Sequence, residues 1–221
     1  MDNRAISLIQ RPSMRAAYTP LFRSLLKQHP DALRQFMKVH ARGLKSWESG
    51  GFQIEALSRP GMAHCGLWKL TLDGQAYFVK ETAPTSRLYD HGGVGEMLAL
   101  SKLVPLENEH VRAVEYLAAV DLSSCNLILT RYYPHERMLD SKKEVPTKLK
   151  FHVFKFAIRA LLNGVYEINM GNVFHDKAEG KALVFDVVEM QPDGRMRKFI
   201  NGVNLALSFV DKLRKKREPA V

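Results

Sequence analysis

The chain has 221 residues, of which 46% are hydrophobic and 25% are charged, and 33 Lys and Arg residues against 23 Asp and Glu residues give a net charge of +10. This composition is ordinary for a globular protein and excludes a fibrous or disordered chain. The two cysteines, Cys65 and Cys125, are too few for a disulfide framework and lack the spacing of a zinc site. The positive charge favours anionic partners such as nucleotides, nucleic acid or an acidic membrane surface.

The N-terminal part of the sequence predicts helices. Apolar residues recur at helical spacing between residues 20 and 46, and Pro30-Asp31 suits the start of a second helix within this stretch. We therefore expect residues 1–50 to form a helical N-terminal extension that ends at Gly50-Gly51. No apolar run approaches the roughly 20 residues of a membrane span, so a soluble, cytoplasmic protein is expected.

Residues 51–133 predict an antiparallel sheet. Short apolar runs at residues 52–57, 67–72 and 75–80 have β character, and Asp73-Gly74 between the last two is a strong signal for a two-residue hairpin. A helical pattern follows at residues 94–103, and two further strands are predicted at 111–119 and 126–130. The expected unit is a five-stranded antiparallel sheet with one helix.

Residues 134–221 predict a small, mainly helical unit. Helices are expected at residues 148–162 and 198–217, with a strand, a turn and a second strand between residues 172 and 188. The last helix carries the basic run 212–217, which lacks the aromatic residues on which single-stranded nucleic acid stacks. Nucleic acid is therefore disfavoured, and peripheral contact with an anionic membrane is an alternative use of this run. The predicted fold class is α+β.

Four polar residues lie at positions that suit a phosphate and metal site. Lys80 ends a predicted strand on the same side as Phe78, and a lysine on a buried side needs a carboxylate partner. Glu96, in the helix that follows, is the natural candidate. Asn172 and Asp186 flank the predicted strand–turn–strand unit and offer the hard oxygen ligands that Mg²⁺ prefers.

The order and spacing of these residues resemble the ATP site of the protein-kinase-like superfamily. Residues 66–80, with a strand, an Asp-Gly turn and a Phe-x-Lys ending, look like small bacterial kinases of the lipopolysaccharide-core type, and Gly171-Asn172-Val173 resembles bacterial small-molecule kinases such as the aminoglycoside type. The resemblance implies a minimal bilobal kinase-like fold. In that family the strand lysine binds phosphate, the helix glutamate holds the lysine, and the Asn and Asp bind Mg²⁺.

The resemblance implies further site residues. Glu189 would join the metal ligands, and the stretch before Lys80 that would form the phosphate loop retains only two glycines, Gly61 and Gly66. The nucleotide contacts would include Thr130 and Tyr132, at the end of the last strand. Glu167, five residues before Asn172, replaces the aspartate that orients or deprotonates the acceptor in this superfamily.

The predicted function is therefore an ATP- and Mg²⁺-dependent phosphotransferase. It would transfer the γ-phosphate to a hydroxyl of a sugar, a lipid-linked sugar or a protein. Two alternatives stay open: a nucleotide-binding pseudokinase that acts through a protein partner, suggested by Glu167 and the sparse glycines, and a basic nucleic-acid-binding module, suggested by the net charge.

Overall fold

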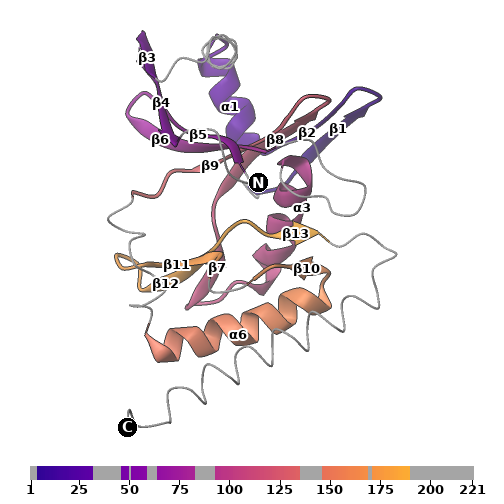
Figure 1. Cartoon of the computed structure of the whole chain (residues 1–221), viewed down its shortest axis with the longest axis vertical. Helices are drawn as coiled ribbons and strands as arrows, with labels where there is room; N and C mark the ends of the chain where they lie inside the picture. The colour runs from indigo at the N-terminus through magenta and orange to yellow at the C-terminus, as the bar shows by residue number, and fades with distance from the viewer. Residues whose placement is uncertain are drawn as a thin grey trace.

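A large antiparallel sheet forms one half of the molecule, and two small sheets with a long helix form the other (Figure 1). The computed structural model describes residues 4–31, 46–49, 51–58, 64–82, 93–134, 146–168 and 171–189. The large sheet has eight strands in the order β1-β2-β8-β9-β6-β5-β4-β3. These strands are β1 (Ser7–Arg11), β2 (Met14–Tyr18), β3 (Ser46–Ser49), β4 (Phe52–Ser58), β5 (His64–Leu72), β6 (Gln75–Thr82), β8 (Tyr116–Leu122) and β9 (Asn126–Arg131).

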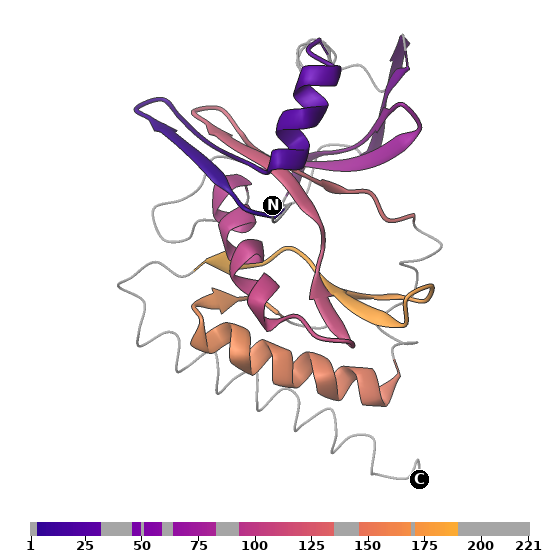
Figure 2. The same ribbon diagram turned by 180° about the vertical axis from the view of Figure 1, so that it is seen from behind.

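Helices cover both faces of the large sheet (Figures 1 and 2). Helix α1 (Pro20–Gln28) begins at Thr19, whose side chain accepts a hydrogen bond from the backbone N–H of Phe22, and Pro20 fits the first helical position. Its Phe22 packs on a core cluster built from one face of the sheet. Helix α3 (Gly93–Leu103) is almost wholly buried, and it belongs to the cluster on the other face.

The predicted hairpin between residues 72 and 75 is confirmed. Strands β5 and β6 pair antiparallel on either side of Asp73 and Gly74, whose φ angles are 46° and 77°. Two successive left-handed residues match the right-handed twist of the paired strands, and Asp-Gly tolerates this conformation. The turn therefore fixes the register that carries Lys80 into the centre of the sheet.

The second half of the molecule is joined to the first through α3. After α3 come the short 3₁₀ helix η1 (Val104–Leu106) and strand β7 (Val111–Ala113), which pairs in parallel with β12 (Lys181–Val184). Strand β12 also pairs with β11 (Val173–Asp176), and β10 (Val165–Tyr166) pairs with β13 (Val188–Glu189). Helix α6 (Thr147–Leu162) packs Val153, Phe156 and Ala160 into the cluster that contains α3, so one core links both halves.

The predicted fold class is wrong in three respects. The large sheet has eight strands rather than five, because residues 7–18 form the hairpin β1–β2, which pairs through β2 with β8, and because β3 pairs with β4 at the opposite edge. The N-terminal extension is therefore only partly helical. Between residues 146 and 189, the described chain holds one helix and strands of two small sheets rather than a mainly helical lobe.

One predicted strand is also divided. Residues 111–119 contain the whole of β7 and the start of β8, because the N–H of Val114 bonds the carbonyl of Val184 in the small sheet while Tyr116 onward pairs with β9 in the large one. The second helix of the extension and the helix at residues 198–217 lie outside the described residues, and the division into units 1–50, 51–133 and 134–221 stays a prediction. In the described part of the chain, no helix is both long and apolar enough to cross a membrane.

Candidate functional site

Lys80 projects from the middle of the large sheet toward the second half of the molecule. Along β6, Tyr77 and Val79 face the cluster under α1, whereas Phe78 and Lys80 line a cavity on the opposite face, as the strand period of two requires. Lys80 is only 6% exposed. Lysine is rarely buried unless it is paired, so its partners decide whether the position is stable.

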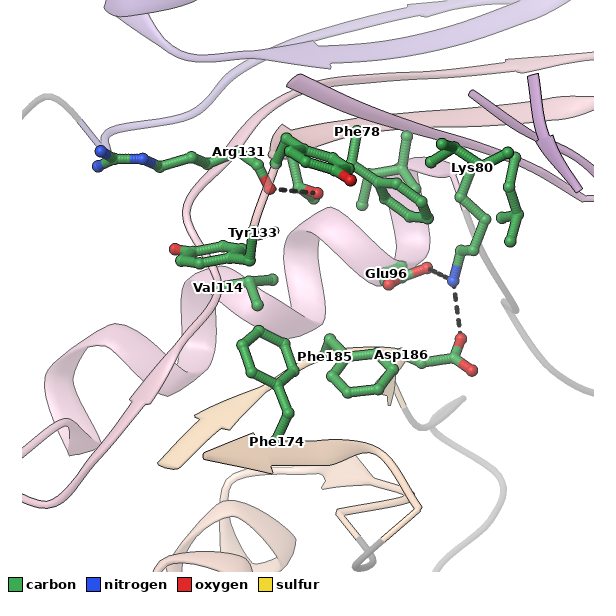
Figure 3. A pocket seen from close by; sticks show the side chains of 14 residues that line it. Phe78, Lys80, Glu96, Val114, Arg131, Tyr133, Phe174, Phe185 and Asp186 are labelled. Carbon is green, nitrogen blue, oxygen red and sulfur yellow. Dashed lines mark hydrogen bonds and ion pairs between the residues drawn. The ribbon is translucent and has the colours of Figure 1, made fainter. Parts of the chain in front are cut away.

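Two carboxylates hold the Lys80 ammonium (Figure 3). Its Nζ forms an ion pair with Glu96 Oε2 of α3, and it lies 2.7 Å from Asp186 Oδ1. Glu96 is 4% exposed, whereas the Asp186 side chain is 43% exposed. The predicted pairing of Lys80 with Glu96 is therefore present, and Asp186 joins the same group from a segment that lies 106 residues farther along the chain.

The start of α3 is fixed from a neighbouring strand. Asp121 of β8 accepts a hydrogen bond of 2.9 Å from the N–H of Val94, one of the donors that a helix N-terminus leaves unsatisfied. Gly93 has a φ of 58°, and a Cβ at this position would collide with the Asp121 carboxylate. Glycine is thus required here, and the resulting cap places Glu96 in the first turn of α3.

The three charges set one another's proton affinity. Burial opposes the charged form of Lys80, but the Glu96 and Asp186 carboxylates outweigh it and raise the pKa of the Lys80 ammonium. Burial raises the pKa of Glu96, and the Asp186 charge adds to this, while Lys80 opposes it. Lys80 is therefore a fixed cation at neutral pH, shared between two anions.

Asn172 holds the turn that carries Asp186. Its Nδ2 donates hydrogen bonds of 2.9 Å to the backbone carbonyls of Glu167 and Asp186, and its own carbonyl accepts one of 3.0 Å from Phe185. Glu167 and Asp186 both have left-handed backbones, with φ angles of 65° and 51°. Such conformations persist only where the surrounding structure fixes them, and the Asn172 amide supplies that constraint.

The cavity beside Lys80 has a volume of about 380 Å³ and is mainly apolar. Its charged end is formed by Lys80, Glu96 and Asp186, and the rest is rich in aromatic rings (Figure 3). Besides these three, the lining residues are Leu57, Leu67, Phe78, Val114, Ile128, Thr130, Arg131, Tyr132, Tyr133, Phe174 and Phe185. The volume is in the range of small-molecule sites.

The other predicted site residues lie in different places. Thr130 and Tyr132 line the cavity, which leaves their predicted contact with a nucleotide a prediction, and Glu167 is exposed after β10. Gly66 is not a lining residue: a Cβ there would collide with the Trp68 side chain and lie 3.3 Å from Glu81, which is a packing reason for glycine. Gly61 and the side chain of Glu189 lie outside the described residues.

Sequence reasoning did not identify several lining residues. Phe78 could have been predicted, because it shares the side of β6 that carries Lys80. Val114, Phe174 and Phe185 reach the cavity from three different places in the chain. Ordinary apolar residues of this kind carry no local signal of a binding site.

Asn172 and Asp186 carry amide and carboxylate oxygens, the kind of ligand that Mg²⁺ prefers. The described residues contain no group of three or more His, Cys, Asp or Glu side chains arranged around a metal position. However, Mg²⁺ commonly takes only one or two protein oxygens and completes its shell with water and substrate phosphates. Because both hydrogen bonds of the Asn172 side chain use Nδ2, its Oδ1 accepts no hydrogen bond from a protein donor in the described structure. The Nδ2 contact is to the backbone carbonyl of Asp186, whose side chain is half-exposed.

No protein-family model matches this sequence, and a search of curated proteins finds no match. The side chains around the cavity are therefore the basis for assigning a function.

Proposed function

We propose that this chain binds a nucleoside triphosphate with Mg²⁺ in the cavity beside Lys80 and transfers the γ-phosphate to a hydroxyl of a sugar, a lipid-linked sugar or a protein. The observation that carries the proposal is a buried ammonium held by two carboxylates at one end of an apolar, aromatic cavity. Phosphoryl transfer requires mainly cationic groups on the phosphates, a metal and a positioned acceptor. The same order of residues underlies the resemblance to the protein-kinase-like superfamily.

The cavity suits a nucleotide because its two ends differ. Aromatic and aliphatic side chains, including Phe78, Tyr133 and Phe174, offer stacking and apolar contact to a planar base. Tyr133 donates no backbone hydrogen bond within the described structure, so its N–H is available to a base. At the other end, the Lys80 ammonium would meet the phosphates.

Lys80 would bind the phosphate group directly, and Asp186 would bind it through Mg²⁺. Glu96 is fully enclosed and stays with Lys80, which keeps the ammonium in place and charged. Asp186 is half-exposed and, with Asn172 Oδ1, would hold Mg²⁺. When bound, the ion would neutralise phosphate charge.

Glu167 is the proposed base. It lies in the loop that Asn172 holds, and it is exposed to an incoming acceptor. In the transfer step, the acceptor oxygen forms a bond to the γ-phosphorus, the bond from that phosphorus to the bridging β,γ-oxygen breaks, and the hydroxyl proton passes to the Glu167 carboxylate. Nucleoside diphosphate and a phosphate ester are the products.

Thermal unfolding with ATP, ADP or GTP, with and without Mg²⁺, tests binding. A ligand at about 100 times its Kd stabilises the folded state by about 2.7 kcal/mol, and Lys80→Met should abolish this effect. The matched control is Lys27→Met, because Lys27 lies exposed on α1 and does not line the cavity. Absence of stabilisation by every Mg²⁺–nucleotide, or an undiminished effect in Lys80→Met, refutes the proposal.

Substitution of Glu167 distinguishes an active transferase from a protein that binds nucleotide without transferring phosphate. Release of ADP that needs an added acceptor, and that falls at least about a hundredfold in Glu167→Ala while nucleotide binding persists, supports the transferase. The pseudokinase alternative rests on the same cavity and on the replacement of the expected aspartate by Glu167. It predicts Mg²⁺-dependent binding with no transfer to any acceptor class.

A further inference from the structure

The N-terminal residues 4–18 lie alongside α3, the helix that carries Glu96 (Figures 1 and 2). Strand β2 pairs with β8 and contacts α3. Ala17, on β2, is 1% exposed and belongs to the same buried cluster as Val94 and Met97 of α3, and Ile6 packs against that cluster. One side of α3 therefore packs against residues 4–18, which are not part of the five-stranded sheet predicted from the sequence.

The same segment reaches the residues that hold both ends of α3. At the N-terminal end, Asp121 caps the helix, and Arg15 Nη1 lies 3.7 Å from the second oxygen of that carboxylate. Beyond the C-terminal end, Arg4 Nη1 donates hydrogen bonds of 2.7 Å to both carboxylate oxygens of Glu107, which directly follows η1. Tyr116 of β8 also donates a hydrogen bond of 3.1 Å to the Arg4 carbonyl.

These contacts differ in strength. The Arg15–Asp121 pair is long and partly exposed, and such pairs contribute little to stability. The hydrogen bonds of Arg4 to Glu107 are short and charge-assisted, with both side chains less than a third exposed, and Ala17 is enclosed. The contacts of Arg4 and Ala17 are therefore the ones that would hold α3 in its observed position.

We infer that residues 4–18 form a clamp that fixes α3 and so positions Glu96 against Lys80. Arg4, Arg15 and Ala17 act as positioning residues, since none of them lines the cavity. If α3 moves, Lys80 keeps only the half-exposed Asp186, and the ammonium no longer has a fixed place. The consequence for nucleotide affinity rests on the proposed function, whereas the consequence for the Lys80–Glu96 pair does not.

The test uses the full chain with Arg4→Gln and, separately, Ala17→Leu, which adds three carbons to an enclosed position. The matched control is Arg112→Gln, which removes a 2.7 Å ion pair to Glu179 that does not involve α3. Three quantities are measured on fully folded protein: amide hydrogen exchange of α3, the rate at which an amine-reactive reagent labels Lys80, and the Kd for Mg²⁺–ATP. Ala17→Leu can fail to fold, but Arg4 is partly exposed, so Arg4→Gln keeps the test decisive.

The clamp predicts that Arg4→Gln speeds α3 exchange and Lys80 labelling about tenfold, the order expected for loss of a charge-assisted pair. It also predicts a Kd that rises by about the same factor, with Arg112→Gln unchanged in all three quantities. Unchanged exchange and labelling in Arg4→Gln overturn the inference. Faster exchange and labelling with an unaltered Kd support the clamp and contradict a nucleotide site that depends on the Lys80–Glu96 pair. If the wild-type chain binds no nucleotide, the proposed function fails, and exchange and labelling still decide whether the clamp holds.

Discussion

Replacing Lys80 by methionine should destabilise the fold through Glu96 rather than through the lost lysine contacts. Methionine retains most of the length of the side chain but removes the charge, so the enclosed Glu96 carboxylate loses its cation. An unpaired buried charge is costly, and the protein can relieve the cost only by protonating the carboxyl group. The half-exposed Asp186 can instead be solvated.

The cost of that protonation sets the size of the effect. The ordinary pKa of a glutamate is 4.5, and each pH unit above it adds about 1.4 kcal/mol, so protonating Glu96 at pH 7 costs at most about 3.5 kcal/mol. This lies within the range of about 3–5 kcal/mol for a broken buried ion pair. In a chain of this length it corresponds to a fall in Tm of about 7–14 °C.

Urea unfolding followed by circular dichroism measures the free energy of unfolding of wild type, Lys80→Met and the double variant Lys80→Met/Glu96→Gln. The double variant should recover most of the loss at pH 7, because a neutral amide needs no cation. The difference between single and double variants should shrink by about 2 kcal/mol between pH 7 and pH 5.5. A single variant as stable as wild type at pH 7, or a difference that does not change with pH, would refute this reasoning.

Three other predictions follow from the site. Gly93→Ala should cost about 2 kcal/mol in urea unfolding, because its left-handed backbone and the contact with Asp121 both disfavour a Cβ; an unchanged midpoint would contradict this. Asn172→Ala removes two hydrogen bonds to backbone carbonyls and should cost about 2 kcal/mol, with Tm as the readout; equal Tm values would show that water replaces both bonds. Because the pKa of Lys80 is raised, the stability due to its charge is complete below 10.5 and is lost as pH rises through the folded value. Above pH 10.5, wild type should therefore lose stability relative to Lys80→Met/Glu96→Gln as pH rises, and parallel curves in that range would exclude a raised pKa of Lys80.

The sequence predicted the parts of this structure that depend on short-range patterns. Alternating apolar residues and the Asp73-Gly74 pair predicted strands β4, β5 and β6 and their hairpin, because both signals act within a few residues. The pairing of Lys80 with Glu96 was also predictable, since a lysine on the buried side of a strand requires a carboxylate.

The features that were missed depend on contacts between distant segments. The hairpin β1–β2 is short, and Leu8 within it is half-exposed, so it carries little apolar alternation of its own. Its place in the sheet comes from pairing with β8. Asp121 caps a helix that begins 28 residues earlier in the chain, and such a cap has no signature in the sequence around the helix. The same holds for the aromatic residues of the cavity, because Phe78 comes from the large sheet and Phe174 from a small one.

The placement of β2 beside β8 also affects the order in which the chain can fold during its synthesis. Tyr18 pairs with Ala118, and Arg4 with Glu107, across about 100 residues. A ribosome adds about 5–20 residues per second, so the first strands wait on the order of 5–20 s before their partner emerges. The hairpin β1–β2 can form alone during this time, but an isolated two-stranded hairpin is at best marginally stable in water. The hairpin β1–β2 can thus join the sheet only after β3 to β6 have been synthesised, and until β8 is synthesised β2 presents an open edge to any other strand in the cell.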